Sequence, residues 1–156
     1  MDRKAEIKKL ASRIKFILPH VQSGEFTENV LVMPFIQILG FDADQVREDT
    51  RNTTLYKLKK TRRPSYTIFK GDRMNLLVEC AHHHEKLEDF ESSLSRYWQK
   101  TKANYAMLTN GIEYRIYSSA MMRINDFSKP LLGFHIDRTP AGLIDKKLQA
   151  HKGLLN

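Results

Sequence analysis

The stretch formed by residues 62–90, RRPSYTIFKGDRMNLLVECAHHHEKLEDF, restricts the fold more than any other part of the sequence. Two β-prone runs, residues 65–69 and 75–80, flank a Gly-Asp turn and predict a β-hairpin. The second run contains the continuous apolar segment LLV, which is typical of a central strand covered on both faces. We therefore expect this hairpin to lie inside a sheet that has helices on both sides.

Hydrophobic spacing predicts helices before and after the hairpin. Apolar residues at helical spacing indicate an amphipathic helix over residues 3–18. A second helix is expected to begin between residues 23 and 25 and to end at Gly40, a favourable C-terminal cap. Pro34 should kink this second helix or loosen its last turns. A third helix is predicted over residues 87–101.

Shorter β-prone runs predict the remaining strands. One or two edge strands are expected within residues 44–58, and a second hairpin is expected over residues 105–118 around an Asn-Gly turn. Residues 131–136 indicate a last strand, and Pro140 opens a closing helix. This order of elements is typical of an α/β domain, with a central mixed sheet flanked by helices and an N-terminal helical pair.

Length and composition favour one soluble domain over residues 1–156. Its expected parts are N-terminal helices over residues 1–40, a sheet core over residues 45–137 and a C-terminal helix over residues 138–156. No apolar run approaches the ~18 residues of a membrane span, and the N-terminus lacks the apolar centre of a signal peptide. The one cysteine, Cys80, suits a reducing compartment. We therefore expect a cytoplasmic protein with no membrane partner.

The chain carries a formal net charge of +8 and has a sequence pI near 9.6. Such an excess of cations favours contact with polyanions, because each neutralised phosphate releases condensed counterions. A solvated basic face is the alternative interpretation, and composition does not decide between the two. The predicted nucleic-acid-binding residues are Lys57, Lys59, Lys60, Arg62, Arg63, Lys70, Arg73, His82, His83 and His84.

The three adjacent histidines, residues 82–84, invite interpretation as a metal site. Neighbouring side chains on a regular element point in different directions, so we expect at most two of these rings to share one ion. A partly exposed link between strand and helix is the preferred interpretation. If the rings have a binding role, contact with phosphate in their protonated form is as reasonable as metal binding.

Four stretches stand in a characteristic order and spacing, ENVLVMPFIQILGFD (28–42), SYTIFKGDRMNLLVEC (65–80), SRYWQKTKANYAMLTNG (95–111) and YRIYS (114–118). From about Arg3 to Asp137 the sequence resembles the N-terminal nuclease-type domain of type I restriction enzyme R subunits, which belongs to the PD-(D/E)xK nuclease superfamily and also occurs as stand-alone and prophage-encoded proteins. The resemblance implies a restriction-endonuclease-like fold.

The resemblance also implies where the catalytic groups of an active member would fall. In such a nuclease an Asp and a Glu on successive strands hold Mg²⁺, a Lys two residues after the Glu orients or activates the attacking water, and a helix Glu and a Gln complete the site. The strand Glu corresponds to Glu79 and the helix Glu, with a weaker match, to Glu25. The Asp, Lys and Gln positions fall on Ser65, Ala81 and Ser93. Glu79 is therefore a weak candidate metal ligand, and no confident catalytic residue is assigned.

These replacements remove the chemistry of the site. Serine offers a neutral oxygen in place of a charged one, and alanine has no polar side-chain atom. Loss of a positioned proton-transfer group alone typically removes ~10²–10⁴-fold of rate. We therefore expect a catalytically inactive nuclease fold that binds nucleic acid, DNA in preference to RNA, and that needs no cofactor.

Two alternative functions stay open. The first is a protein-interaction module or inhibitor that acts on a host restriction or defence complex in a phage context. The second is a metal-dependent DNA endonuclease with relocated catalytic residues, for which Mg²⁺ would be the cofactor. A homodimer is compatible with either alternative and with the nucleic-acid-binding interpretation.

Overall fold

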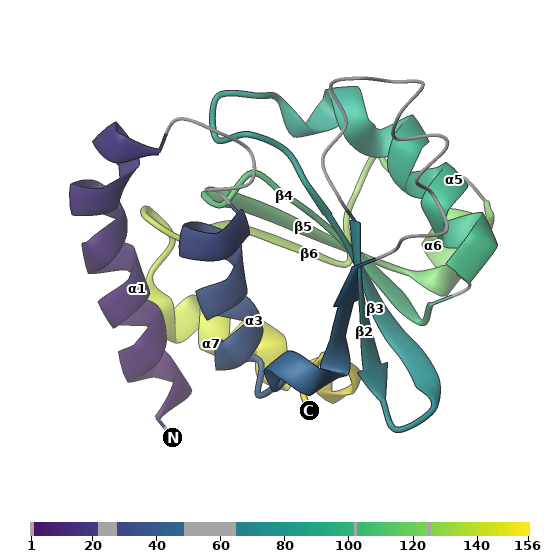
Figure 1. The fold of residues 1–156 in the computed structure, drawn as a ribbon, viewed down its shortest axis with the longest axis horizontal. Helices are drawn as coiled ribbons and strands as arrows, with labels where there is room; N and C mark the ends of the chain where they lie inside the picture. Colours follow the sequence, from purple (N-terminus) through teal and green to yellow (C-terminus); the bar gives the residue numbers. More distant parts are fainter. Residues whose placement is uncertain (1, 22–27, 49–64, 102, 125) are drawn as a thin grey trace.

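A computed structural model of the chain describes residues 2–21, 28–48, 65–101, 103–124 and 126–156. Within these residues six strands form one sheet in the order β1-β2-β3-β4-β5-β6 (Figure 1). The strands are β1 (Val46–Glu48), β2 (Ser65–Lys70), β3 (Arg73–Cys80), β4 (Tyr105–Thr109), β5 (Glu113–Ser118) and β6 (Leu132–His135).

Helices cover both faces of this sheet. The helices α1, α3 and α7 lie on one face, and α5 and α6 lie on the other (Figure 1). This arrangement confirms the predicted α/β fold with a sheet flanked by helices. The helices are α1 (Arg3–Ile17), α3 (Met33–Ile38), α5 (Glu91–Thr101), α6 (Ser119–Arg123) and α7 (Ala141–Gln149).

The strand pairing is antiparallel throughout the described sheet except between β3 and β4. β3 and β4 are parallel and are joined by the crossover that contains α5. Both predicted hairpins are present, β2–β3 and β4–β5. Their turns contain Gly71 (φ +60°) and Gly111 (φ +87°), whose backbone conformations side chains rarely adopt. The sheet is therefore mixed, as predicted.

The helix α1 has the predicted amphipathic pattern, with Ile7, Leu10 and Ile14 buried. It ends at Ile17, one residue earlier than expected, and a 3₁₀ turn, Leu18–His20, follows. Near its beginning α1 is tied to α7 by an ion pair between Arg3 Nη1 and Asp145 Oδ1 at 3.0 Å. No helix within the described residues is long and apolar enough to span a membrane.

The second predicted helix is divided into a π-helix, Glu28–Val32, and α3. Pro34 is the second residue of α3, where its missing N–H removes no helical hydrogen bond. The loosening expected from Pro34 therefore occurs before the proline, in the wider π turn, and not in the last turns. The predicted beginning of this helix, residues 23–25, lies outside the described residues. Gly40 follows α3 with φ +96°, as expected for a C-terminal cap.

The strand β3 is buried from Asn75 to Cys80 because two hydrophobic cores meet on it. The α1-side core contains the aromatic trio Phe35, Tyr114 and Phe134 and takes Leu76, Val78 and Cys80 from β3. The α5-side core takes Leu77 from β3 and Ala81 just after it, and its other members are Leu87, Leu94, Trp98, Ala103, Ala106, Leu108, Tyr117 and Met122. The two-sided burial predicted for this strand is confirmed.

Two elements differ from the sequence-based expectations. The helix α6 was not predicted; it begins after Ser118, whose Oγ accepts a hydrogen bond from the Met121 N–H at 3.4 Å. A five-residue helix gives too short a periodic pattern to be identified from spacing. Of the edge strands expected within residues 44–58, the structure describes β1, which pairs with β2; residues 49–58 lie outside the described part.

The two-sided burial of β3 predicts a large stability difference between two leucine truncations. Leu76→Ala should lower the free energy of unfolding by ~2–5 kcal/mol, because Leu76 is fully buried and the truncation leaves a cavity. Leu143→Ala, at a 45% exposed position of α7, should change it by less than ~0.5 kcal/mol. Urea denaturation of both variants measures the difference. Similar losses in both would contradict the placement of β3 at the centre of the fold.

Candidate functional site

The register of β2 on β3 places Ser65 directly across from Glu79. The antiparallel ladder continues with Thr67 across from Leu77, so these four positions belong to one face of the sheet. That face is the one covered by α5, because Leu77 belongs to the α5-side core. The structure thus brings together the two positions at which the resemblance expects the acidic pair of a nuclease.

Glu79 and Ala81 are both enclosed at this point. Glu79 is 1% exposed, and its register partner on β4 is the fully buried Leu108. Ala81 is 0% exposed; its N–H donates to the Thr109 carbonyl at 2.7 Å, which extends the β3–β4 pairing. The Ala81 methyl group is therefore a packing element of the α5-side core at the position where an active nuclease would have a lysine.

Two buried side-chain hydroxyl groups are also found on β2 and α5, at Thr67 and Ser93. Thr67 is 3% exposed on β2, and Ser93, at the predicted Gln position, is 4% exposed on α5. Neither hydroxyl has a hydrogen-bond partner among the residues that the structure describes. The remaining predicted site residue, Glu25, lies outside the described residues.

These donors fit a magnesium ion poorly. Mg²⁺ prefers an octahedron of hard oxygen ligands that includes one or two carboxylates and several waters. Within the described part of the chain, Glu79 belongs to no group of three His, Cys, Asp or Glu side chains with converging ligand atoms. Thr67 and Ser93 can add neutral oxygens, and Ala81 adds none. The described positions therefore supply one formal negative charge where the resemblance expects two.

The histidines follow β3 in a turn, His82–Glu85, which we call the histidine turn. The Glu85 N–H donates to the His82 carbonyl at 2.9 Å, and the His82 N–H donates to Glu85 Oε1 at 2.7 Å. The ring centroids lie 3.8–5.0 Å apart, and one ligand nitrogen from each ring lies within 4.8 Å of the others. The expectation that at most two rings could share an ion applied the geometry of a regular element, whereas these rings stand on a turn that brings one nitrogen of each together; it stays a prediction.

The close packing of the rings changes the protonation of His83. Its pKa is lowered to about 4, first by burial and then by repulsion between its charged form and His82 and His84. The His83 ring is therefore neutral near pH 7. A neutral imidazole offers phosphate no positive charge, so this ring does not act as a cationic contact at that pH.

The predicted basic residues fall into two described groups that lie apart. Lys70 and Arg73 flank the turn between β2 and β3, whereas the histidine turn follows the opposite end of β3. Seven residue steps along β3 separate these ends by ~23 Å. The structure does not bring these groups into one patch. The other predicted cations, Lys57, Lys59, Lys60, Arg62 and Arg63, lie outside the described residues.

Lys70 and Arg73 line a cleft of about 530 Å³, which we call the hairpin cleft. Asn75, which is 4% exposed, donates to the Gly153 carbonyl at 3.0 Å, and Lys70 Nζ donates to the same oxygen at 2.9 Å. Arg73 is exposed at the edge of this cleft. The hairpin cleft therefore combines two cations with amide groups, which are donors suited to an anion.

Sequence reasoning missed a charged cleft of about 810 Å³ beside α5. At its centre Arg115 of β5 contacts three carboxylates, Glu88 at 2.5 Å, Glu113 at 3.0 Å and Glu91 at 3.5 Å. Glu88 and Glu91 line the cleft with Asp126, so acids outnumber the cation there. Alternation along β5 could have placed Glu113 and Arg115 on one face, but no sequence signal joins them to residues more than 20 positions earlier.

The burial of Ala81 makes a catalytic-type replacement disruptive. Ala81→Lys should lower the free energy of unfolding by at least ~2 kcal/mol, because a long cationic side chain would be forced into the α5-side core. Ala120→Lys, at an exposed position of α6, is the matched control and should change it by less than ~0.5 kcal/mol. Denaturant unfolding checks both. An unchanged stability of Ala81→Lys would show that position 81 opens into a polar site.

A comparison with known protein families gives a match over most of the sequence. Residues 25–127 match the family model described as Type I restriction enzyme R protein N terminus. The matched span runs from before the π-helix to beyond α6 and includes the positions 65, 79 and 81. No curated protein and no solved structure matches the chain significantly. Since the match covers well over half of the sequence, the chain belongs to the family of the type I restriction enzyme R protein N terminus.

Proposed function

We propose that the protein is a catalytically inactive nuclease-type domain that binds nucleic acid through basic residues. The observation that carries this proposal is the pairing of Ser65 with Glu79 beside a fully buried Ala81. A nuclease of this type uses two carboxylates to hold a metal ion, which stabilises the charge that develops on the phosphate. One buried carboxylate opposite a serine lacks the charge for that task, and an alanine cannot move a proton.

The same replacements favour binding without cleavage. A carboxylate near a phosphodiester repels it unless a metal ion lies between them, so replacing an acid by a serine lowers the repulsion. The chain as a whole carries +8 charges, which attract a polyanion from a distance and supply phosphate contacts. Membership in a restriction enzyme family favours DNA as the nucleic acid.

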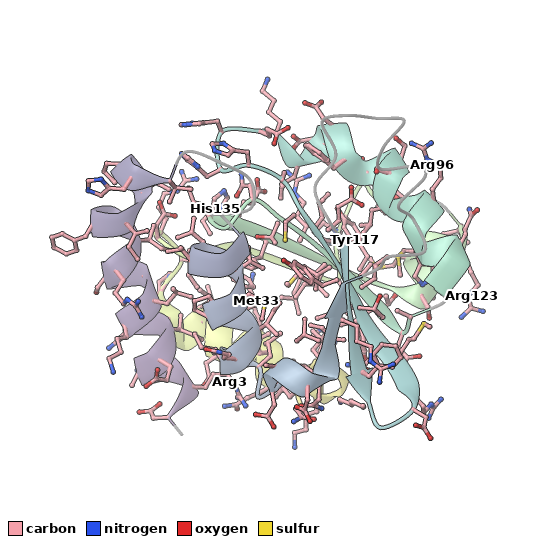
Figure 2. The ribbon with its side chains drawn as sticks, viewed as in Figure 1. Arg3, Met33, Arg96, Tyr117, Arg123 and His135 are labelled. Carbon is pink, nitrogen blue, oxygen red and sulfur yellow. The ribbon has the colours of Figure 1, made fainter. Side chains whose placement is uncertain are left out.

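The basic residues of the proposed interface come from three parts of the chain. The cluster KLKKTRR, residues 57–63, ends two residues before Ser65 in the sequence. Lys70 and Arg73 contribute two more cations, which line the hairpin cleft. Figure 2 shows two further exposed cations, Arg96 and Arg123, on the outer sides of α5 and α6. By contrast, the acid-rich cleft around Arg115 is unsuited to a phosphate backbone, and we leave it outside the interface.

Removal of charge from the cluster KLKKTRR should weaken binding in a measurable way. A variant with Lys57, Lys59 and Lys60 replaced by Gln should bind duplex DNA more weakly than the wild-type chain. Its slope of log affinity against log salt concentration should be smaller by about 2.7, since each phosphate contact contributes ~0.9. Fluorescence anisotropy with a labelled duplex at several salt concentrations measures both quantities.

The helix α1 provides a control that removes the same charge. Lys4, Lys8 and Lys9 are exposed there, and their replacement by Gln lowers the net charge by the same three units. The control variant should keep the wild-type slope, because charge removed outside the interface eliminates no phosphate contact. An equal reduction of slope in both variants would indicate that binding depends on net charge alone, and would contradict specific phosphate contacts by the cluster. A salt-independent affinity in the wild-type chain would contradict the proposed phosphate contacts altogether.

A further inference from the structure

We propose that His82, His83 and His84 together bind one divalent first-row transition-metal cation, for which Zn²⁺ is the representative ion. This site differs from the remnant nuclease position, because its ligands are imidazoles that follow β3 and not carboxylates within the sheet. The inference does not depend on the proposed nucleic-acid binding. It rests on the geometry of the histidine turn.

The three ligand nitrogens are close to the spacing that a tetrahedral ion requires. They lie within 4.8 Å of one another. Nitrogens bonded to Zn²⁺ at ~2.0–2.1 Å in a tetrahedron are ~3.4 Å apart. The widest pair would therefore approach by at most ~1.4 Å, which small rotations of two rings about their side-chain bonds can supply.

The backbone that carries the rings is held in place before any ion binds. Glu85 closes the turn through its backbone N–H and its carboxylate, which both bond to His82. The amide of Asn110, in the β4–β5 turn, donates to the Glu85 carbonyl at 3.2 Å and joins the histidine turn to the neighbouring hairpin. Because the chain is already ordered, metal binding would lose little conformational entropy, and preorganised ligands bind more tightly than flexible ones.

A buried ring nitrogen supplies a second, independent observation. His83 Nδ1 is inaccessible to solvent and has no hydrogen-bond partner among the described residues. Buried polar atoms are almost always satisfied, and an exception in a native structure calls for a water or an ion. A cation bound through this nitrogen, together with one nitrogen of each neighbouring ring, would satisfy this atom. The His84 N–H donates to His82 Nδ1 at a long 3.3 Å, so a modest rotation of the His82 ring sacrifices only a weak contact.

The donor set determines the class of ion. Neutral imidazoles suit Zn²⁺, Co²⁺, Ni²⁺ and Cu²⁺, whereas Mg²⁺ and Ca²⁺ require oxygen ligands. Three protein ligands leave the fourth tetrahedral position for water or for an exogenous ligand. The proposed site therefore has one exchangeable coordination position at the end of β3.

Isothermal titration of the full chain with Zn²⁺ tests the proposal. The chain must be free of a polyhistidine tag and treated with a chelator beforehand. We expect one equivalent of Zn²⁺ per chain, no binding of Mg²⁺ by the histidine turn, and ligand-field bands typical of tetrahedral geometry when Co²⁺ replaces Zn²⁺. His84→Ala, which removes an exposed ring, should weaken Zn²⁺ binding at least ~10-fold, since even loss of a residue that only orients a ligand costs 10–100-fold.

Two variants serve as matched controls. His20→Ala removes an exposed histidine from the turn after α1, and Glu79→Gln removes the remnant carboxylate at nearly constant volume. Both should retain the wild-type affinity for Zn²⁺. Absence of stoichiometric binding, unchanged affinity in His84→Ala, or a loss confined to Glu79→Gln would overturn the proposal.

A measurement on the wild-type chain covers the case in which a histidine variant fails to fold. Addition of Zn²⁺ should shift the imidazole NMR signals of His82, His83 and His84 and leave that of His20 in place. Shifts spread over all histidines, or absent from these three, would contradict a common site. Both approaches use the intact chain.

Discussion

β3 lies between β2 and β4, and its residues from Asn75 to Cys80 are buried because helices cover both faces of the sheet. This double coverage determines the environment of the candidate site. Glu79 lies within the buried segment, and Ala81 continues the α5-side core beyond the end of the strand. A carboxylate in such surroundings has little water to solvate its charge. The residues across from it and beside it therefore determine which charged ligand it can hold.

The parallel pairing of β3 with β4 gathers the candidate features at one edge of the sheet. The carboxyl ends of both strands point to this edge, where the histidine turn meets the β4–β5 turn through Glu85 and Asn110. Ligand sites in α/β sheets commonly lie beyond the carboxyl ends of the strands. In this protein Glu79 and the three clustered imidazoles of the histidine turn lie toward this edge.

Much of the fold could be predicted from the sequence because local signals agreed with the tertiary packing. The hairpins followed from their glycine turns, α1 from its helical spacing, and the central strand from its unbroken apolar run. The register of Ser65 on Glu79 needed the structure, since an irregularity between Ile68 and Phe69 shifts the pairing. The position of Pro34 could be read from the sequence, but not the π turn that precedes it.

The candidate site was predicted less completely, for physical reasons. The sequence resemblance assigned Glu79 and the replaced positions, whose roles stay predictions, and the structure adds that Ser65 lies across from Glu79. Convergence of His82, His83 and His84 could not be derived, because a turn has no period from which side-chain directions follow. The ion pairs of Arg115 join segments that are distant in sequence, and pairing of this kind arises only from the packing of α5 on the sheet.

We propose that the single carboxylate at the end of β3 does not support metal-dependent cleavage in a domain that binds DNA. Incubation of supercoiled plasmid with excess protein in Mg²⁺ or Mn²⁺ tests it most directly, with a gel-shift assay run on the same samples. We expect a shifted plasmid that stays supercoiled in both metals. Nicked or linear plasmid that requires the metal and disappears in Glu79→Gln would contradict it.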